Sequence, residues 1–179
     1  MAPTGRALFG TQVSLRQEWH LRRRRREPRH FSLLARRQGF DAVLFEPEPR
    51  HAAFLERNAS TFGIVRPWAL SDTSGTATFY VAGSHNLAAS SLSPPGSDAE
   101  QALYESKTTV EVDTFDGALS RLGVDPAEVA LIKVDVEDNE ARTVRGMSDY
   151  LSNHTAPVWC EVRGRARRAA ARATSPSSR

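Results

Sequence analysis

The chain has 179 residues, 40% of them hydrophobic and 25% charged, which suits one soluble globular domain because folding at this length buries roughly 70% of the unfolded surface. Its single cysteine, Cys160, excludes an intramolecular disulfide framework and a cysteine cluster for zinc. No window approaches about 18 consecutive apolar residues and no signal-peptide pattern opens the chain, so we expect a cytoplasmic protein that does not contact a membrane.

The net charge of +3 conceals a strong segregation of charge along the chain. Residues 1–40 hold 10 arginines and 2 acids, residues 163–179 hold 6 arginines and no acid, and residues 41–162 carry a net charge of −11. Blocks of like charge such as Arg22 to Arg26 repel one another and stay solvated. The sequence therefore predicts an α/β domain over 31–162 between an arginine-rich disordered segment, 1–30, and a basic disordered tail, 163–179.

Within 31–162, helical and strand patterns alternate. In chain order they predict a short helix before Gly39, a strand over 41–45, a helix from Pro49, strands over 64–70, 76–81 and 108–112, a helix capped by Thr114 and ended by Gly123, a strand from Val129, a helix over 141–151 and a strand over 157–162. Turn-forming residues at 71–75 join two of these strands as a hairpin or strand extension. The alternation is typical of βαβ units and predicts a mainly parallel sheet.

The strand that begins at Val129 ends abruptly in acidic residues. Ligands of open α/β sheets bind beyond the carboxyl ends of the parallel strands, so Asp135 and Glu137 are candidates for a binding or catalytic role. The long connection 83–105, rich in Gly, Ser and Pro, is a second candidate region, because loops of that length are usually functional or disordered.

Four motifs in register carry a resemblance to a known family. They are Val43 to Pro49 with Leu55 and Asn58, Ala69 to Asp72 with Gly75, Ser90-Ser91-Leu92, and Ile132 to Glu137 with Glu140, Arg145 and Gly146. Together these residues resemble the FkbM-type methyltransferases. The resemblance implies a Rossmann-like class I methyltransferase sheet, S-adenosylmethionine as cofactor, and O-methylation of a hydroxyl on a small molecule or saccharide.

The resemblance also implies roles for three residues on the cofactor side. Glu46 corresponds to the acid that binds the two ribose hydroxyls, a task suited to a carboxylate because it accepts two hydrogen bonds at once. Asp72 corresponds to the position near the adenine amine, and Leu70 beside it supplies an apolar contact. The alternatives are that Glu46 is a surface acid in a turn and that Asp72 performs ordinary turn chemistry.

On the acceptor side, Asp135 is expected to hold the cofactor's amino group or to act as base, and Glu137 to face polar groups of the acceptor. Lys133 is expected to keep one of these carboxylates ionised. The alternative is a helix N-terminus whose acids complement the dipole, and this account suits Glu140 better. His85 is a conceivable base, but a lone loop histidine is more often solvated. We predict no metal, because successive strand residues point to opposite faces.

Three departures separate the chain from the family pattern. The glycine-rich turn expected just before Phe31 is replaced by the arginine run, Asp138 stands where the family usually has Gly, and the chain becomes Arg- and Ala-rich after Gly164. We therefore expect the central strand to be missing, the sheet to be incomplete at both ends, and the enzyme to be a truncated or inactive copy with weak or no cofactor binding.

The competing hypothesis is a non-catalytic protein whose arginine-rich ends contact nucleic acid or another polyanion. No aromatic residues are interleaved with these arginines in a recognition pattern, so solvated ends are the preferred interpretation. The sequence identifies neither the methyl acceptor nor the oligomeric state.

Overall fold

The computed structural model of the chain describes residues 7–11, 31–83 and 90–162. The strands are β1 (Ala7–Thr11), β2 (Asp41–Phe45), β3 (Ile64–Arg66), β4 (Trp68–Leu70), β5 (Gly75–Ala82), β6 (Tyr104–Asp113), β7 (Val129–Val134) and β8 (Val158–Cys160). The helices are α1 (Phe31–Arg37), α2 (Pro49–Arg57), α3 (Ala59–Phe62), α4 (Asp98–Gln101), α5 (Phe115–Leu122), α6 (Glu140–Arg145) and α7 (Ser148–Asn153), with a 3₁₀ turn at Pro126–Glu128. None of the helices in these ranges is long and apolar enough to cross a membrane.

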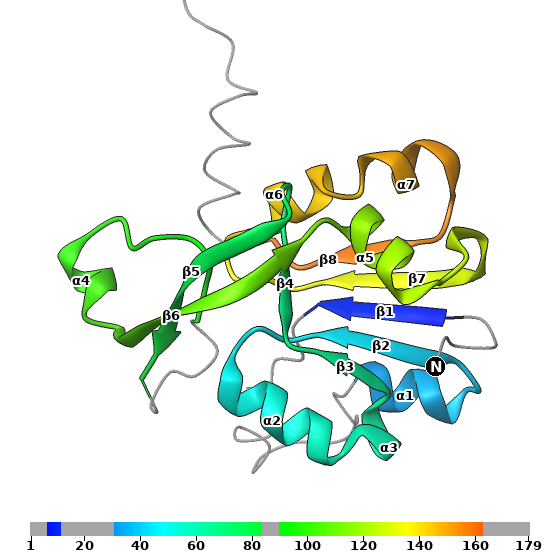
Figure 1. The fold of residues 1–179 in the computed structure, drawn as a ribbon, viewed down its shortest axis with the longest axis horizontal. Coiled ribbons are helices and arrows are strands. Elements are labelled where there is room, and N and C mark those ends of the chain that lie inside the picture. The colour runs from blue at the N-terminus through cyan, green and yellow to red at the C-terminus, as the bar shows by residue number, and fades with distance from the viewer. Residues whose placement is uncertain (1–6, 12–30, 84–89, 163–179) are drawn as a thin grey trace, which may run out of the picture.

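The larger sheet has five strands in the order β3-β2-β1-β7-β8, and all its neighbouring strands are parallel. Strand β1 lies at its centre, between β2 and β7 (Figure 1). The expectation of a missing central strand is therefore wrong. A strand needs only a short apolar run with parallel partners, which Ala7-Leu8-Phe9 provides, and it does not depend on a glycine-rich turn after it.

Helices cover both faces of this sheet, as alternating side chains of β2 demonstrate. Val43 and Phe45 belong to one hydrophobic core with residues of α5, β7 and α7, whereas Ala42 and Leu44 belong to a second core with Leu55 of α2. Successive residues of a strand point to opposite faces, so β2 is buried on both sides. The mainly parallel sheet predicted from the sequence is confirmed for these five strands.

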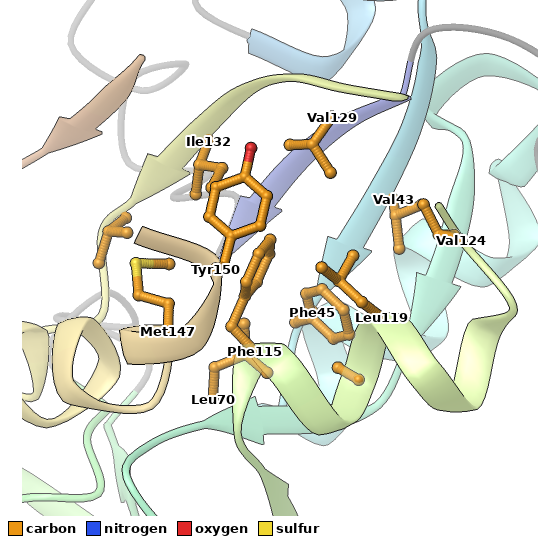
Figure 2. Close-up of a cluster of buried hydrophobic side chains, with 12 residues drawn as sticks. Val43, Phe45, Leu70, Phe115, Leu119, Val124, Val129, Ile132, Met147 and Tyr150 are labelled. Atoms are coloured by element: carbon orange, nitrogen blue, oxygen red, sulfur yellow. The ribbon is translucent and has the colours of Figure 1, made fainter. Parts of the chain in front are cut away.

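The first core is built around a pair of aromatic rings (Figure 2). The rings of Phe115 and Tyr150 meet edge to face, with centroids 5.2 Å apart and an interplanar angle of 82°, and Met147 lies fully buried in the same cluster. Such an arrangement adds about 0.5–1.5 kcal/mol to the burial of the two rings. This contact packs α5 and α7 together on one face of the sheet.

A second, three-stranded sheet has the order β4-β6-β5, with β4 parallel and β5 antiparallel to β6. The predicted strand 64–70 is divided at Pro67, since β3 joins the larger sheet and β4 joins the smaller one. Proline lacks the N–H that a ladder needs, which accounts for the break. The predicted hairpin across 71–75 is also wrong, because β6 lies between β4 and β5.

The helix ends follow local chemistry, with one exception. The Thr114 side chain accepts a hydrogen bond from the amide of Gly117, and Gly123 ends α5 in the left-handed conformation, so both predictions for that helix are confirmed. The predicted helix 141–151 is instead divided into α6 and α7 at Gly146. A Cβ at this glycine would lie 1.9 Å from the carbonyl oxygen of Ser71, so the close approach of these two backbones requires glycine.

Candidate functional site

The candidate site lies at the carboxyl ends of β2 and β7, the two strands that flank β1. The order β3-β2-β1-β7-β8 places the reversal of strand order between β1 and β7, the position where doubly wound sheets form their ligand crevice. Glu46 directly follows β2, and Asp135 directly follows β7. Their carboxyl groups interact electrostatically, so the structure brings together these two acids from distant parts of the sequence.

Glu46 has a buried carboxyl group in which one of the two oxygens accepts a hydrogen bond from the described residues. Its side chain is 0% exposed, Oε1 accepts a hydrogen bond of 2.9 Å from the amide of Glu48, and Oε2 has no hydrogen-bond partner among the residues that the structure describes. Burial raises the pKa of Glu46 to about 8; the amide of Glu48 opposes that rise, while the carboxylates of Glu48 and Asp135 add to it. The interpretation of Glu46 as a surface acid does not agree with this burial.

Glu48 is buried beside it and caps helix α2. Its Oε2 accepts a hydrogen bond of 2.7 Å from the amide of His51, and its Oε1 accepts one of 2.7 Å from Nε of Arg50. Arg50 in turn donates to the carbonyl oxygen of Ala82, 3.0 Å away. The carboxylate of Glu48 is thus committed to fixing the first turn of α2 and linking it to β5.

His51 completes this group, and the sequence analysis missed it. The residue is 7% exposed, and neither ring nitrogen has a hydrogen-bond partner. Nδ1 lies 3.9 Å from Oε2 of Glu46 and 3.7 Å from Oε2 of Glu48. Burial lowers the pKa of His51, although the Glu48 carboxylate acts in the opposite direction. The sequence does contain a signal for His51, because it lies in the first turn of the helix that follows the Glu46-Pro47-Glu48-Pro49 motif.

Asp135 is also buried and is charge-balanced by a residue near the end of the preceding strand β7. Nζ of Lys133 donates to Oδ2 of Asp135 across 2.7 Å. Residues i and i+2 of a strand lie on the same face, which brings the ammonium and the carboxylate together. Lys133 therefore contacts one of the two strand-end carboxylates, and its role in keeping that carboxylate ionised stays a prediction.

The turn after Asp135 has an unusual backbone. Glu137 and Asp138 both have positive φ angles, 50° and 71°. The hydroxyl of Ser91 donates to the carbonyl oxygen of Glu137, and that of Ser93 donates to the carbonyl oxygen of Asp138, 3.1 Å away. Two serines of the long connection 83–105 therefore hold the turn that presents Glu137. Asp138, which stands where the family usually has Gly, therefore adopts the left-handed conformation that glycine prefers.

Glu140 occupies the start of α6 and faces back toward that turn. Its Oε1 accepts a hydrogen bond of 3.1 Å from the amide of Asp138, while Oε2 is buried without a hydrogen-bond partner. Burial raises the pKa of Glu140 against the opposing effect of its backbone hydrogen bonds. The contact with Asp138 agrees with a structural role at the helix N-terminus, which was the preferred interpretation.

The structure separates Leu70 from Asp72. Leu70 lines a small pocket together with Phe45, Pro47, Ala69, Phe79, Leu92, Val136 and Asn139. Asp72 instead accepts hydrogen bonds from Nε of Arg142 at 2.8 Å and from NH2 of Arg145 at 2.9 Å. Loss of water contact acts to raise the pKa of Asp72, but the two arginines outweigh it and hold that pKa below its usual range.

These observations describe a crevice at the switch point of a parallel sheet, with one buried acid on each side of the central strand. The chain matches the model of the Methyltransferase FkbM domain over residues 25–171. It belongs to the FkbM methyltransferase family. Enzymes of this family use S-adenosylmethionine and transfer its methyl group to an acceptor. No curated protein and no solved structure matches the chain.

Several predictions for this FkbM methyltransferase concern residues that the structure does not describe. His85 lies outside the described residues, as do all but residues 7–11 of the arginine-rich segment 1–30 and the whole tail 163–179. Over the described ranges, no group of three or more His, Cys, Asp or Glu side chains is arranged to hold a metal ion.

Proposed function

We propose that this FkbM methyltransferase binds S-adenosylmethionine at the carboxyl ends of β2 and β7 and methylates a hydroxyl of a small molecule or saccharide. Glu46, Leu70, Asp72 and Asp135 form the cofactor-binding set, and Asp135 and Glu137 face the acceptor. The expectation of weak or no cofactor binding depended on a missing central strand and on the absent glycine-rich turn. Since β1 is present, we infer that the sheet provides the strand that the cofactor side of the site needs.

The observation that carries this proposal is the unpartnered Oε2 of Glu46. A buried polar atom without a hydrogen bond costs about 1–3 kcal/mol, so its persistence at a strand end favours a ligand that donates to it. A ribose offers two adjacent hydroxyls, which suit a carboxylate with one oxygen open. Leu70 lines a small apolar pocket with Phe45 and Pro47, the two residues that flank Glu46 in the sequence, and we infer that the base of the same nucleoside lies on this side of the sheet edge.

Bound S-adenosylmethionine supplies an electrophilic methyl group. The residues of the chain then have to hold the acceptor hydroxyl in line with it, and this positioning contributes more than a strong base does. Asp135 accepts the hydroxyl proton in this proposal, with Lys133 balancing its charge at 2.7 Å. Glu137 orients the acceptor, because the bonds from Ser91 and Ser93 fix the turn that carries it.

Calorimetric titration of the full chain with S-adenosylmethionine tests the cofactor site. We expect micromolar affinity for the wild type and a loss of tenfold or more in Glu46→Ala. The matched control is Glu56→Ala, which removes an exposed acid from α2, the helix that follows Glu46 in the chain. If Glu46→Ala binds as tightly as the control variant, the assignment of Glu46 is wrong.

The acceptor side needs a separate measurement. Incubation with S-adenosylmethionine and a panel of hydroxylated small molecules and saccharides, followed by mass spectrometry, should reveal a product heavier by one methylene group. Glu137→Gln should then lower turnover while leaving cofactor affinity unchanged. Loss of cofactor affinity in Glu137→Gln would place this residue on the cofactor side instead. No contact among the described residues favours the competing polyanion-binding function.

A further inference from the structure

Two buried polar groups without hydrogen-bond partners among the described residues face each other on the cofactor side of the site. Oε2 of Glu46 has no hydrogen-bond partner, and neither has Nδ1 of His51, although the two atoms are only 3.9 Å apart. Both side chains are buried, Glu46 completely and His51 to all but 7%. A buried acid and a buried base left in this relation can exchange a proton after a small rotation or through one bridging water.

The other carboxylates around this pair already accept hydrogen bonds from other groups. Glu48 faces both side chains, but its carboxylate binds Arg50 and the His51 amide. Asp135 faces Glu46 from β7, and its carboxylate binds Lys133. Among the described residues, the imidazole of His51 is therefore a base beside Glu46 whose ring nitrogens have no hydrogen-bond partner.

We propose that His51 is a positioning residue that takes up the proton of Glu46 when the nucleoside part of the cofactor binds. The inference depends on the proposed function, in which Glu46 holds the ribose. A ribose diol donates two hydrogen bonds, and a carboxylate accepts both, whereas a protonated carboxyl must also find an acceptor for its own O–H. Binding is thus stronger when the proton resides elsewhere.

The exchange balances within the site. The O–H bond of Glu46 breaks, an N–H bond forms at Nδ1 of His51, and the pair changes from neutral acid and neutral imidazole to carboxylate and imidazolium. The net charge does not change. The imidazolium then lies between two carboxylates, those of Glu46 and Glu48, at starting distances of 3.9 and 3.7 Å. Before the ligand binds, the raised pKa of Glu46, about 8, and the lowered pKa of His51 keep this proton on Glu46 in most molecules at pH 7, so the transfer depends on the hydrogen bonds that the diol donates to the carboxylate.

The test uses 5′-deoxy-5′-methylthioadenosine, which has the adenine and the ribose diol but no group that titrates between pH 7 and 9. Calorimetry at pH 7 in two buffers of different ionisation enthalpy measures the protons released on binding. We expect almost no release from the wild type. In His51→Gln the proton must go to solvent, so with a Glu46 pKa of about 8 we expect release of about 0.9 proton per ligand bound.

The pH dependence of affinity gives a second readout. Between pH 7 and 9 the affinity of His51→Gln should rise roughly tenfold as Glu46 ionises, and that of the wild type should not rise. His154→Gln is the matched control, because it removes a histidine that stacks on Tyr150 in α7 rather than facing the acids, and it should behave as the wild type does.

Each outcome decides a different claim. Release of nearly one proton by the wild type overturns the role of His51 and leaves the cofactor site in place. This measurement needs no variant, so it holds even if His51→Gln folds poorly. Binding of neither methylthioadenosine nor S-adenosylmethionine by the wild type overturns the proposed function itself.

Discussion

Replacement of Glu46 by glutamine should stabilise the protein, and increasingly so as the pH rises. Burial raises the pKa of Glu46 from 4.5 to about 8, so the folded state holds a proton that the unfolded state has lost between these values. The free energy of unfolding therefore falls with pH across this window. Glutamine resembles the protonated acid in shape, can still accept from the Glu48 amide, and does not titrate.

The size of the effect follows from the pKa shift. Each unit corresponds to about 1.4 kcal/mol, so the advantage of Glu46→Gln over the wild type should grow from near zero at pH 4.5 to at most about 3 kcal/mol at pH 7. Above pH 8 it should level off at an upper limit of about 5 kcal/mol. The lowered pKa of His51 separately destabilises the folded state as the pH falls below 6.5.

Urea denaturation at pH 4.5, 7 and 9 measures the difference directly. Glu56→Gln, at an exposed position of the neighbouring helix α2, should differ from the wild type by less than about 0.5 kcal/mol at every pH. A Glu46→Gln variant that is less stable than the wild type at pH 9, or whose advantage does not change with pH, would refute the burial of an uncompensated carboxyl at this position.

Two further substitutions test the backbone of the site. Gly146→Ala should lower the free energy of unfolding by about 1–3 kcal/mol or more, because its Cβ would lie 1.9 Å from the carbonyl oxygen of Ser71. The control is Gly83→Ala, whose Cβ would have no described atom nearer than 3.7 Å and which should change that free energy by less than about 0.5 kcal/mol. Equal thermal shifts for the two variants would contradict the close approach at Gly146. Asp138 has a φ of 71°, so Asp138→Gly should leave the free energy of unfolding unchanged or raise it by up to about 1 kcal/mol, and Asp138→Val should lower it by about 1–2 kcal/mol. Chemical denaturation measures both changes. Equal destabilisation of the two variants would argue against the left-handed turn.

Local patterns in the sequence determined much of this protein. The strand at 41–45, the Thr114 cap and the Gly123 stop of α5 depend on residues close in sequence, and each is found where it was predicted. The family followed from the same source, because its motifs keep their order and spacing along the chain. Glu46 and Asp135 were recognised as strand-end acids for this reason.

Tertiary structure alone decided what depends on distant partners. Ala7–Thr11 becomes the central strand because β2 and β7 pair with it from both sides, and Gly146 divides a helix because Ser71 approaches it from elsewhere in the chain. Asp72 likewise meets its two arginines about 70 residues later. The Oε2 of Glu46 and the imidazole of His51 face each other without a hydrogen bond, a relation that depends on burial and on the side chains around them. Periodicity and capping act within a few residues, whereas such contacts arise only when separate elements pack together.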